Sequence, residues 1–225
     1  MRHIELFAGC GGLSLGLESV GFEFVLGNEL SPMAAETFAY NFFNENLSEL
    51  AKAQTKPARV KWINSRNDDL NARLRENPFE FPTIDESGYS DLPADICDYE
   101  GKLLVGSVRE LNTLLSQRPE LADALHNSFG RGELTLVSGG PPCQSFSMAG
   151  KRERHNEKNS LPWEFAKFVE MTKPKLVLLE NVTGILRAFK SPETGEKFHA
   201  WFEVAKVFAS IGYVPLCLHV NARHV

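Results

Sequence analysis

The sequence has little of several features that would place a protein in a class at once. No run of about 18 apolar residues is present, and no basic segment precedes an apolar one, so neither a membrane span nor a signal peptide is indicated. Basic residues are not in excess: 24 Lys and Arg stand against 29 Asp and Glu, which excludes a polycation that coats nucleic acid. We therefore expect a cytoplasmic protein with no membrane partner, whose contacts with nucleic acid are local.

Cysteine is also scarce. Cys10, Cys97, Cys143 and Cys217 are far apart, and no two of them form a Cys-x-x-Cys pair. This spacing argues against a zinc site and against a disulfide framework, so we predict no metal. The ordinary expectation for each free cysteine is a small buried apolar residue.

What is present is the pattern of an α/β domain. At 225 residues and 43% hydrophobic, the chain can bury a sizeable core. Residues 2–7 predict a strand, a glycine turn follows, and apolar residues then recur at helical spacing as far as Gly21. Residues 22–27 predict a second strand, and Ser31-Pro32 predicts a helix that runs to about Asn44. Two such units in tandem predict a doubly wound, mostly parallel sheet.

Residues 45–101 interrupt this pattern. They contain Pro57, Pro78, Pro82 and Pro93 and show no sustained periodicity, although residues 47–75 could hold helices. We expect a peripheral, partly helical insertion. The alternative is an element that contacts a partner or DNA, because long loops often carry function.

Regular elements return after residue 101. Strands are predicted at 102–106, 134–138, 175–179 and 213–220, and helices from about Val108, at 161–171 and at 195–211. In an open parallel sheet, ligands bind at the carboxyl ends of the strands. The unusual residues of this chain follow predicted strands, so we expect them to share one edge.

The first of these groups predicts a cofactor site. Gly9, Gly11 and Gly12 follow the first strand, and Glu29 lies twenty positions after Gly9. A glycine turn lets the backbone approach a cofactor, and an acid at this distance commonly binds ribose hydroxyls. NAD, FAD and S-adenosylmethionine all fit this pattern. The spacing is not G-x-G-x-x-G, which favours a cofactor without a pyrophosphate.

The second group predicts a nucleophile. Two prolines stiffen the backbone directly before Cys143, in a loop after the predicted strand 134–138. Basic residues follow closely, and a positive field favours the thiolate. These basic residues are Lys151, Arg152, Arg154, His155 and Lys158.

The third group supplies a carboxyl group. Glu180 ends the apolar strand 175–179, so we expect its carboxyl group to be partly desolvated, with a raised pKa suited to a general acid or to a donor to a ring nitrogen. Asn181 is predicted to orient this loop, and a simple turn residue is an equal alternative.

These residues resemble a known family. Phe7-Ala8-Gly9-Cys10-Gly11-Gly12, Gly140-Pro141-Pro142-Cys143-Gln144 and Glu180-Asn181-Val182 resemble, in order and spacing, three signature motifs of the DNA cytosine-5 methyltransferases. The resemblance implies a Rossmann-like fold that binds S-adenosyl-L-methionine. It also implies double-stranded DNA as the partner, in which a flipped cytosine receives a methyl group at C5 through a Cys143 adduct at C6.

The resemblance also assigns the site residues. The catalytic group is Cys143, Glu180 and Asn181. The cofactor group is Phe7, Ala8, Gly9, Cys10, Gly11, Gly12, Glu29, Leu30, Ser107, Val108, Pro142 and Leu161. The loop that would contact DNA and close over the base contributes Gln144, Ser145, Ser147, Lys151, Arg152 and Arg154.

The sequence departs from the family at three points. The connection between the second and third strands is far longer than usual. Ser107 stands where the family usually has an acid that binds the adenine amine, and Val225 comes just before the expected arginine-rich motif. We therefore expect residues 1–225 to be an incomplete catalytic domain without its target recognition domain, weak or inactive alone, from a restriction–modification system. The alternatives are a tRNA cytosine-5 methyltransferase and a catalytically incomplete subunit of a split enzyme.

Overall fold

The structure is a computed structural model, and it describes residues 1–142, 161–186, 188–190 and 197–220. The chain divides into two compact units. Unit 1 comprises Met1–Gly140 and Met171–Leu179, and unit 2 comprises Pro141–Glu170 and Glu180–Val225. In the described part of the chain, no helix is both long and apolar enough to cross a membrane.

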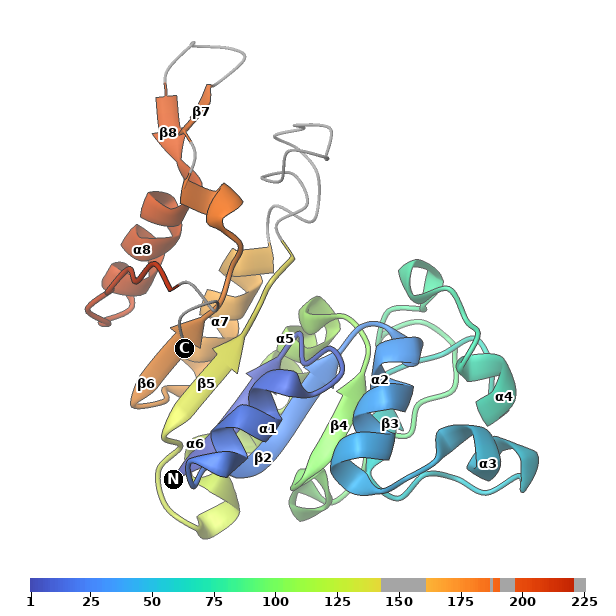
Figure 1. Cartoon of the computed structure of the whole chain (residues 1–225). Coiled ribbons are helices and arrows are strands. Elements are labelled where there is room, and N and C mark those ends of the chain that lie inside the picture. Colours follow the sequence, from blue (N-terminus) through green and yellow to red (C-terminus); the bar gives the residue numbers. More distant parts are fainter. Residues whose placement is uncertain (143–160, 187, 191–196, 221–225) are drawn as a thin grey trace. The chain divides into compact units, whose positions relative to one another are not determined.

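Unit 1 is built on a six-stranded sheet of order β3-β4-β2-β1-β5-β6 (Figure 1), in which every paired strand is parallel to its neighbour. Its strands are β1 (Arg2–Leu6), β2 (Glu23–Glu29), β3 (Val60–Trp62), β4 (Lys102–Val105), β5 (Leu136–Gly139) and β6 (Leu176–Leu179). Strands β2, β4 and β3 lie on one side of β1, and β5 and β6 lie on its other side. The predicted doubly wound α/β class is confirmed.

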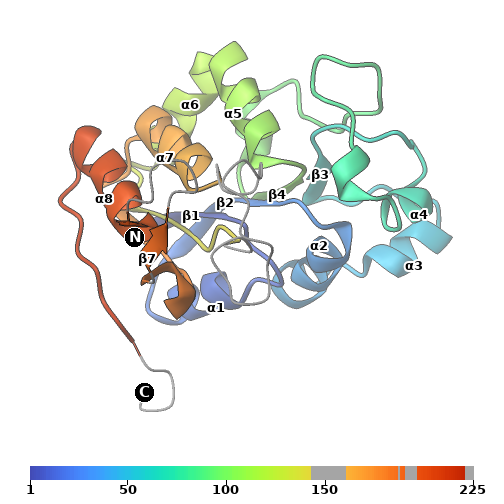
Figure 2. The same cartoon turned by 90° about the horizontal axis from the view of Figure 1, so that it is seen from above.

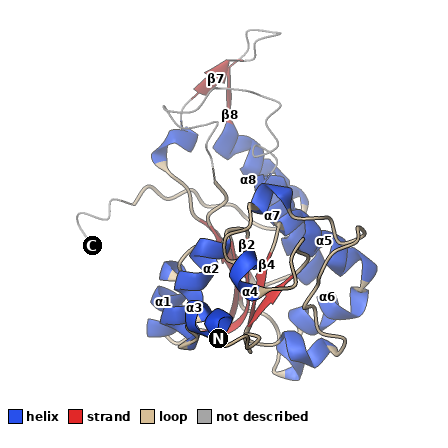
Figure 3. Cartoon of the chain, turned by 90° about the vertical axis from the view of Figure 1, so that its right-hand side faces the viewer, coloured by secondary structure: helices blue, strands red, loops and turns tan. Residues whose placement is uncertain are grey.

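Helices cover both faces of this sheet. Helices α1 (Gly12–Ser19) and α2 (Pro32–Phe38) lie on one face, while α5 (Val108–Gln117) and α6 (Pro119–His126) lie on the other (Figures 2 and 3). Ile4, Leu6, Val25 and Leu26 are fully buried between these layers. Parallel strands covered on both faces are expected to be apolar along their whole length. The middle of β2 follows this expectation, whereas β1 contains the buried titratable residues His3 and Glu5.

Local sequence explains how α2 begins. The Ser31 hydroxyl accepts a hydrogen bond from the Ala34 N–H at 3.4 Å, and Pro32 occupies the first helical position. After Phe38 the helix widens into a π-helical turn, Ala39–Phe43, which ends at Asn44 in the left-handed conformation. The predicted helix from Ser31-Pro32 to Asn44 is therefore confirmed, with this change in its last turn.

The segment 45–101 is partly helical, as predicted, but the expectation that it lies at the periphery was wrong for part of it. This segment contributes the edge strand β3, the helices α3 (Leu47–Lys52) and α4 (Leu70–Arg73), and the short 3-10 turns Pro78–Glu80 and Ile96–Tyr99. Trp62 and Tyr99 are fully buried, and Trp62 belongs to the same core cluster as Phe24 and Phe38. A three-residue strand is too short to show periodicity, so only the packing reveals it.

Unit 2 holds α8 (Ala200–Ser210), most of α7 (Leu161–Thr172), the 3-10 turn Thr183–Leu186, and an antiparallel pair of β7 (Ala188–Lys190) and β8 (Lys197–His199). The Phe165 and Phe208 rings, 6.0 Å apart, join α7 to α8. The predicted strand at 213–220 was wrong. These residues have no regular structure, and Val214 is 96% exposed, because alternating apolar residues form a strand only where a partner strand pairs with them.

Candidate cofactor site and candidate catalytic loop

The turn between β1 and α1 has an unusual backbone. Phe7, Gly9 and Gly11 all have positive φ, at 55°, 53° and 88°. A phenylalanine in this region costs energy, and such strain concentrates at functional sites. A Cβ on Gly11 would lie 2.9 Å from the Phe38 ring, whereas a Cβ on Gly9 or Gly12 would meet nothing within 4 Å. The turn thus packs on α2 at Gly11 and is open at Gly9 and Gly12.

Glu29 joins this turn to β2. Its Oε2 accepts the Gly9 N–H at 2.7 Å, and its Oε1 accepts the Ser31 N–H at 2.7 Å. The structure therefore brings together two predicted cofactor residues that lie twenty positions apart. Each carboxylate oxygen has two lone pairs, so Glu29 can still accept hydrogen bonds from ligand hydroxyls.

Asn28 is a structural residue of this edge that sequence reasoning missed. Its side chain is 1% exposed and donates to the Leu104 and Gly106 carbonyls, both at 3.0 Å, which fastens the end of β2 to the end of β4. The signal was an amide within an otherwise apolar strand, directly before Glu29. Ser107 is the N-cap residue of α5, and its hydroxyl oxygen accepts a hydrogen bond from the Arg109 N–H at 3.2 Å. Val108, the first residue of α5, is buried.

Two buried titratable residues lie on β1 beneath the glycine turn. Glu5 is 3% exposed and accepts a hydrogen bond from the Ser14 hydroxyl of α1. Burial raises the pKa of Glu5 to about 7, the Ser14 contacts oppose that rise, and the nearby Glu29 adds to it. His3 is fully buried, and its burial lowers its pKa to about 4. The sequence pattern predicts no role for either residue.

This edge has an acceptor and an open backbone turn, two features that suit an adenosyl cofactor. The open side of Gly9 and Gly12 lets a ligand approach the backbone, Glu29 offers lone pairs for ribose hydroxyls, and half-buried Leu30 follows it directly. Ser107 supplies a hydroxyl where the family usually has a carboxylate. The residues present therefore fit the cofactor, with the adenine end the most altered.

In unit 2, Asn181 joins two of the predicted motifs. Its Nδ2 donates to the Pro141 carbonyl at 3.1 Å, and its Oδ1 accepts the Val182 N–H at 2.8 Å. Pro141 is buried and Pro142 is exposed. The segment after β6 is therefore hydrogen-bonded to the backbone carbonyl of Pro141, two residues before Cys143. Asn181 thus contacts both its own turn and the proline segment, and its role in orienting the loop stays a prediction.

The expected desolvation of Glu180 was wrong for this structure. Its side chain is exposed, and two apolar residues of the preceding strand, Leu176 and Leu178, are 57% and 42% exposed. The reason is that β6 is the edge strand of the sheet, so an apolar sequence does not ensure burial at its end.

The predicted nucleophile and the predicted DNA-contacting loop lie outside the described residues. They are Cys143, Gln144, Ser145, Ser147, Lys151, Arg152 and Arg154. Leu161 is the first residue of α7 and is half-buried. Cys10, Cys97 and Cys217 are free and exposed, so the ordinary expectation of burial was wrong for these three.

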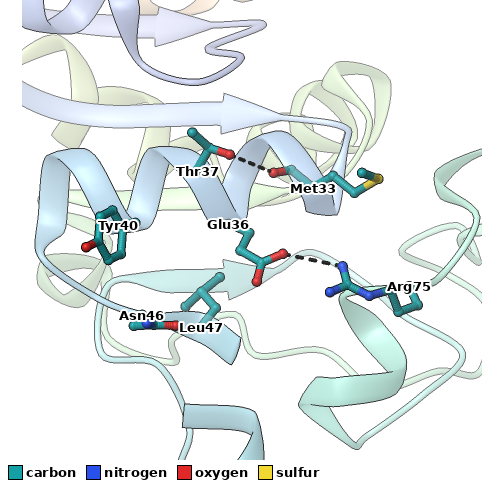
Figure 4. A pocket seen from close by; sticks show the side chains of 7 residues that line it. All are labelled: Met33, Glu36, Thr37, Tyr40, Asn46, Leu47 and Arg75. Atoms are coloured by element: carbon teal, nitrogen blue, oxygen red, sulfur yellow. Dashed lines mark hydrogen bonds and ion pairs between the residues drawn. The ribbon is translucent and has the colours of Figure 1, made fainter. Parts of the chain in front are cut away.

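The described part of the chain also contains an open hollow of about 560 Å³ on the outer side of α2 (Figure 4). The Glu36 carboxylate and the Arg75 guanidinium approach to 3.4 Å there, and Met33 and Tyr40 line it. None of its lining residues is a predicted site residue, so the hollow is separate from the predicted cofactor and catalytic residues.

Several known proteins are similar to this chain. The type II methyltransferase M.DdeI of Desulfomicrobium norvegicum is 26% identical over 99% of this chain and 36% of its own length. M1.HphI of Haemophilus parahaemolyticus is 24% identical over 99% of this chain and 41% of its own. M.HgiGI of Herpetosiphon aurantiacus is 27% identical over 81% of this chain and 90% of its own. The chain thus spans about two fifths of the first two relatives.

A solved structure described as a prophage-encoded DNA modification methyltransferase from E. coli aligns over 93% of this chain and 38% of its own, with 21% identity and a TM-score of 0.48. The family described as C-5 cytosine-specific DNA methylase matches residues 1–70 and 120–225. That match covers well over half of the chain and includes the glycine turn, the Pro-Pro-Cys segment and Glu180-Asn181. The chain belongs to the C-5 cytosine-specific DNA methylase family.

Proposed function

We propose that the protein containing these residues transfers a methyl group from S-adenosyl-L-methionine to C5 of cytosine in double-stranded DNA, as the methyltransferase of a type II restriction–modification system. Family membership supports the reaction class, and the type II methyltransferases among its relatives support the DNA substrate. The observation that carries the cofactor assignment is the 2.7 Å hydrogen bond from the Gly9 N–H to Glu29, at the carboxyl edge of a parallel sheet.

The cofactor supplies an electrophilic methyl group when bound. On the protein side, the open turn at Gly9 and Gly12 receives the ligand, and Glu29 binds the ribose hydroxyls. Leu30 and Val108 form the apolar walls of the adenine site. Ser107 is the polar group at its edge, where a hydroxyl replaces the usual carboxylate. This replacement predicts a weaker hydrogen bond to the adenine amine.

Cys143 is the proposed nucleophile. Its thiolate adds to C6 of cytosine, and the bond formed places electron density on C5, which then takes the methyl group. Loss of the C5 proton to a base returns the electron pair to the ring and expels the thiolate. Glu180 accepts a hydrogen bond from the exocyclic amine of the cytosine and, when it carries a proton, donates that proton or a hydrogen bond to N3, which stabilises the charge that develops on the ring during addition.

Cytosine in a duplex exposes neither face to a thiolate, so the base must be flipped into the site. The segment that begins at Gln144 and includes Lys151, Arg152 and Arg154 is the proposed contact with DNA, because its positive charges suit phosphates. Asn181 acts as a positioning residue by holding Pro141, two residues before the nucleophile.

The test uses the product of the whole reading frame that contains these residues. The protein is incubated with S-adenosylmethionine and DNA duplexes that contain 5-fluorocytosine, and the products are separated on denaturing gels. Fluorine cannot leave C5 as a proton does, so a covalent protein–DNA band should form with the native protein and with Cys97→Ser. It should be absent with Cys143→Ser. A band that persists in Cys143→Ser would overturn the assigned nucleophile.

A tRNA cytosine-5 methyltransferase uses related chemistry and remains the second candidate. The same assay with transfer RNA distinguishes the two, because methyl transfer to tRNA with none to DNA would replace DNA as the proposed substrate. A catalytically incomplete subunit is a third outcome, recognised by cofactor binding without transfer to either nucleic acid.

A further inference from the structure

Glu5 connects the strand before the glycine turn to the helix after it. It lies on β1, two residues before Phe7, and its carboxyl group accepts hydrogen bonds from the hydroxyl and the backbone N–H of Ser14. Glu5 is 3% exposed and Ser14 is fully buried. The turn is therefore held by two carboxyl groups, Glu5 through α1 and Glu29 through Gly9.

The charges around Glu5 do not favour its ionised form. Among the described residues, Glu29 on β2 is the charged group that acts on it, and it is also an anion. His3 lies two positions earlier on the same strand. Its ring packs edge-on against Phe22 and Phe24, with centroids 6.2 and 5.6 Å away, and burial keeps it neutral at ordinary pH. Burial and Glu29 together raise the pKa of Glu5 to about 7.

Ionisation near neutral pH therefore has a structural consequence. The Ser14 hydroxyl and N–H bind the carboxylate more strongly than the neutral group, but the cost of burying the charge is larger and Glu29 adds repulsion, so the net effect of ionisation in this dry position is unfavourable. The cost of burying the charge and the repulsion by Glu29 both act on residues that flank the Phe7–Gly12 turn. The part of this turn that is open to a ligand is the side of Gly9 and Gly12.

We propose that Glu5 is a proton-linked positioning residue of the cofactor site: its neutral form holds the glycine turn in the conformation that binds cofactor, and its ionisation loosens that turn. This inference rests on the proposed function, because it assumes that the turn binds an adenosyl cofactor. Glu5 itself need not touch the ligand.

The experiment is a calorimetric titration of the protein with S-adenosylhomocysteine at a series of pH values on both sides of neutrality. The affinity of the native protein for S-adenosylhomocysteine should fall as pH rises through about 7. The fall depends on how far bound ligand raises the pKa of Glu5: each pKa unit allows a loss of up to about tenfold in affinity. Glu5→Gln keeps the shape and cannot ionise, so its affinity should stay level. Glu23→Gln, at the exposed start of β2, is the matched control and should follow the native profile.

Ser14→Ala provides a second, independent variant. The Ser14 contacts lower the pKa of Glu5, so their loss should move the midpoint of the affinity profile to higher pH. The role of Glu5 would be overturned if the affinity of Glu5→Gln fell with pH as steeply as that of the native protein. It would also be overturned if the affinity profile of Ser14→Ala had the same midpoint pH as the native profile. Either result would leave the proposed function intact. Failure of the native protein to bind S-adenosylhomocysteine at every pH would instead overturn the proposed function, and this inference with it.

Discussion

The Asn181 side chain donates to the Pro141 carbonyl at 3.1 Å, and this hydrogen bond joins the motif Glu180-Asn181-Val182 to the motif that begins at Gly140. The two residues lie forty positions apart in the sequence, and each follows a different strand of the parallel sheet. A single amide thus connects the segment after β6 to Pro141, two positions before Cys143 in the sequence.

The first prediction concerns this contact. Asn181→Ala should slow covalent trapping of 5-fluorocytosine DNA by about two- to tenfold, the equivalent of one hydrogen bond, while the affinity for S-adenosylhomocysteine stays unchanged. Asn127→Ala is the matched control, because the exposed Asn127 amide also donates to a backbone carbonyl at 3.1 Å. Equal trapping rates in Asn181→Ala and the native protein would show that Asn181 does not position the nucleophile.

Glu29 is predicted to control cofactor binding. Glu29→Ala removes the acceptor of the Gly9 and Ser31 N–H groups, and loss of charged hydrogen bonds costs about 1.5–3 kcal/mol each. The affinity for S-adenosylhomocysteine should therefore fall by at least about tenfold. Calorimetry measures this, with Glu23→Ala at the other end of β2 as control. A fall of equal size in both variants would argue for general destabilisation.

Two glycines of the first βα unit should respond to alanine with opposite signs. Gly11→Ala places a Cβ 2.9 Å from the Phe38 ring at a φ of 88°, so we expect a loss of about 1–3 kcal/mol in the free energy of unfolding. Gly16 lies within α1 with open space around its Cβ position, so Gly16→Ala should gain about 0.5–1 kcal/mol. Urea denaturation measures both changes. Destabilisation by Gly16→Ala would contradict the assigned helix.

The pH dependence of stability should reflect Glu5 and His3 acting in opposite directions. The folded pKa of Glu5 is about 7, above its ordinary value of 4.5, so its contribution is complete below pH 4.5 and is lost, by about 3 kcal/mol, as pH rises to 7. The pKa of His3 is lowered from 6.5 to about 4, so its contribution is complete above pH 6.5 and is lost as pH falls toward 4.

These two slopes nearly cancel between pH 4.5 and 6.5. Glu5→Gln should remove one of them, so that the free energy of unfolding of this variant rises with pH across that interval, where the native protein stays almost level. Urea denaturation at a series of pH values checks this. A level profile in Glu5→Gln would show that the two groups do not oppose each other.

Trp62 tests whether residues 45–101 are part of the core. Trp62→Ala should lower the free energy of unfolding by about 3–5 kcal/mol, because it removes a fully buried side chain that also packs under the Arg73 guanidinium. Phe79→Ala is the matched control, since Phe79 belongs to the same segment and is 69% exposed. Similar small losses in both variants would restore the view of a peripheral insertion.

Much of the fold was readable because local signals agreed. The glycine turn after β1, the Ser31-Pro32 helix start and the apolar runs within β2, β4, β5 and β6 each predict the element that the structure contains. The failures have physical causes. β3 is too short to show a period. Residues 213–220 have a strand pattern, but none of the strands that the structure describes pairs with them. Glu180 follows β6, which lies at the edge of the described sheet and is partly exposed.

The sequence by itself determined the family and the candidate chemistry, because methyl transfer to cytosine needs particular side chains in a particular order along the chain. Only the tertiary structure decided which backbone atoms those side chains hold. Glu29 meets Gly9, Asn181 meets Pro141 and Glu5 meets Ser14 across separate elements. Such contacts depend on strand order and helix packing, which no local pattern encodes, and burial then sets the proton affinity of Glu5.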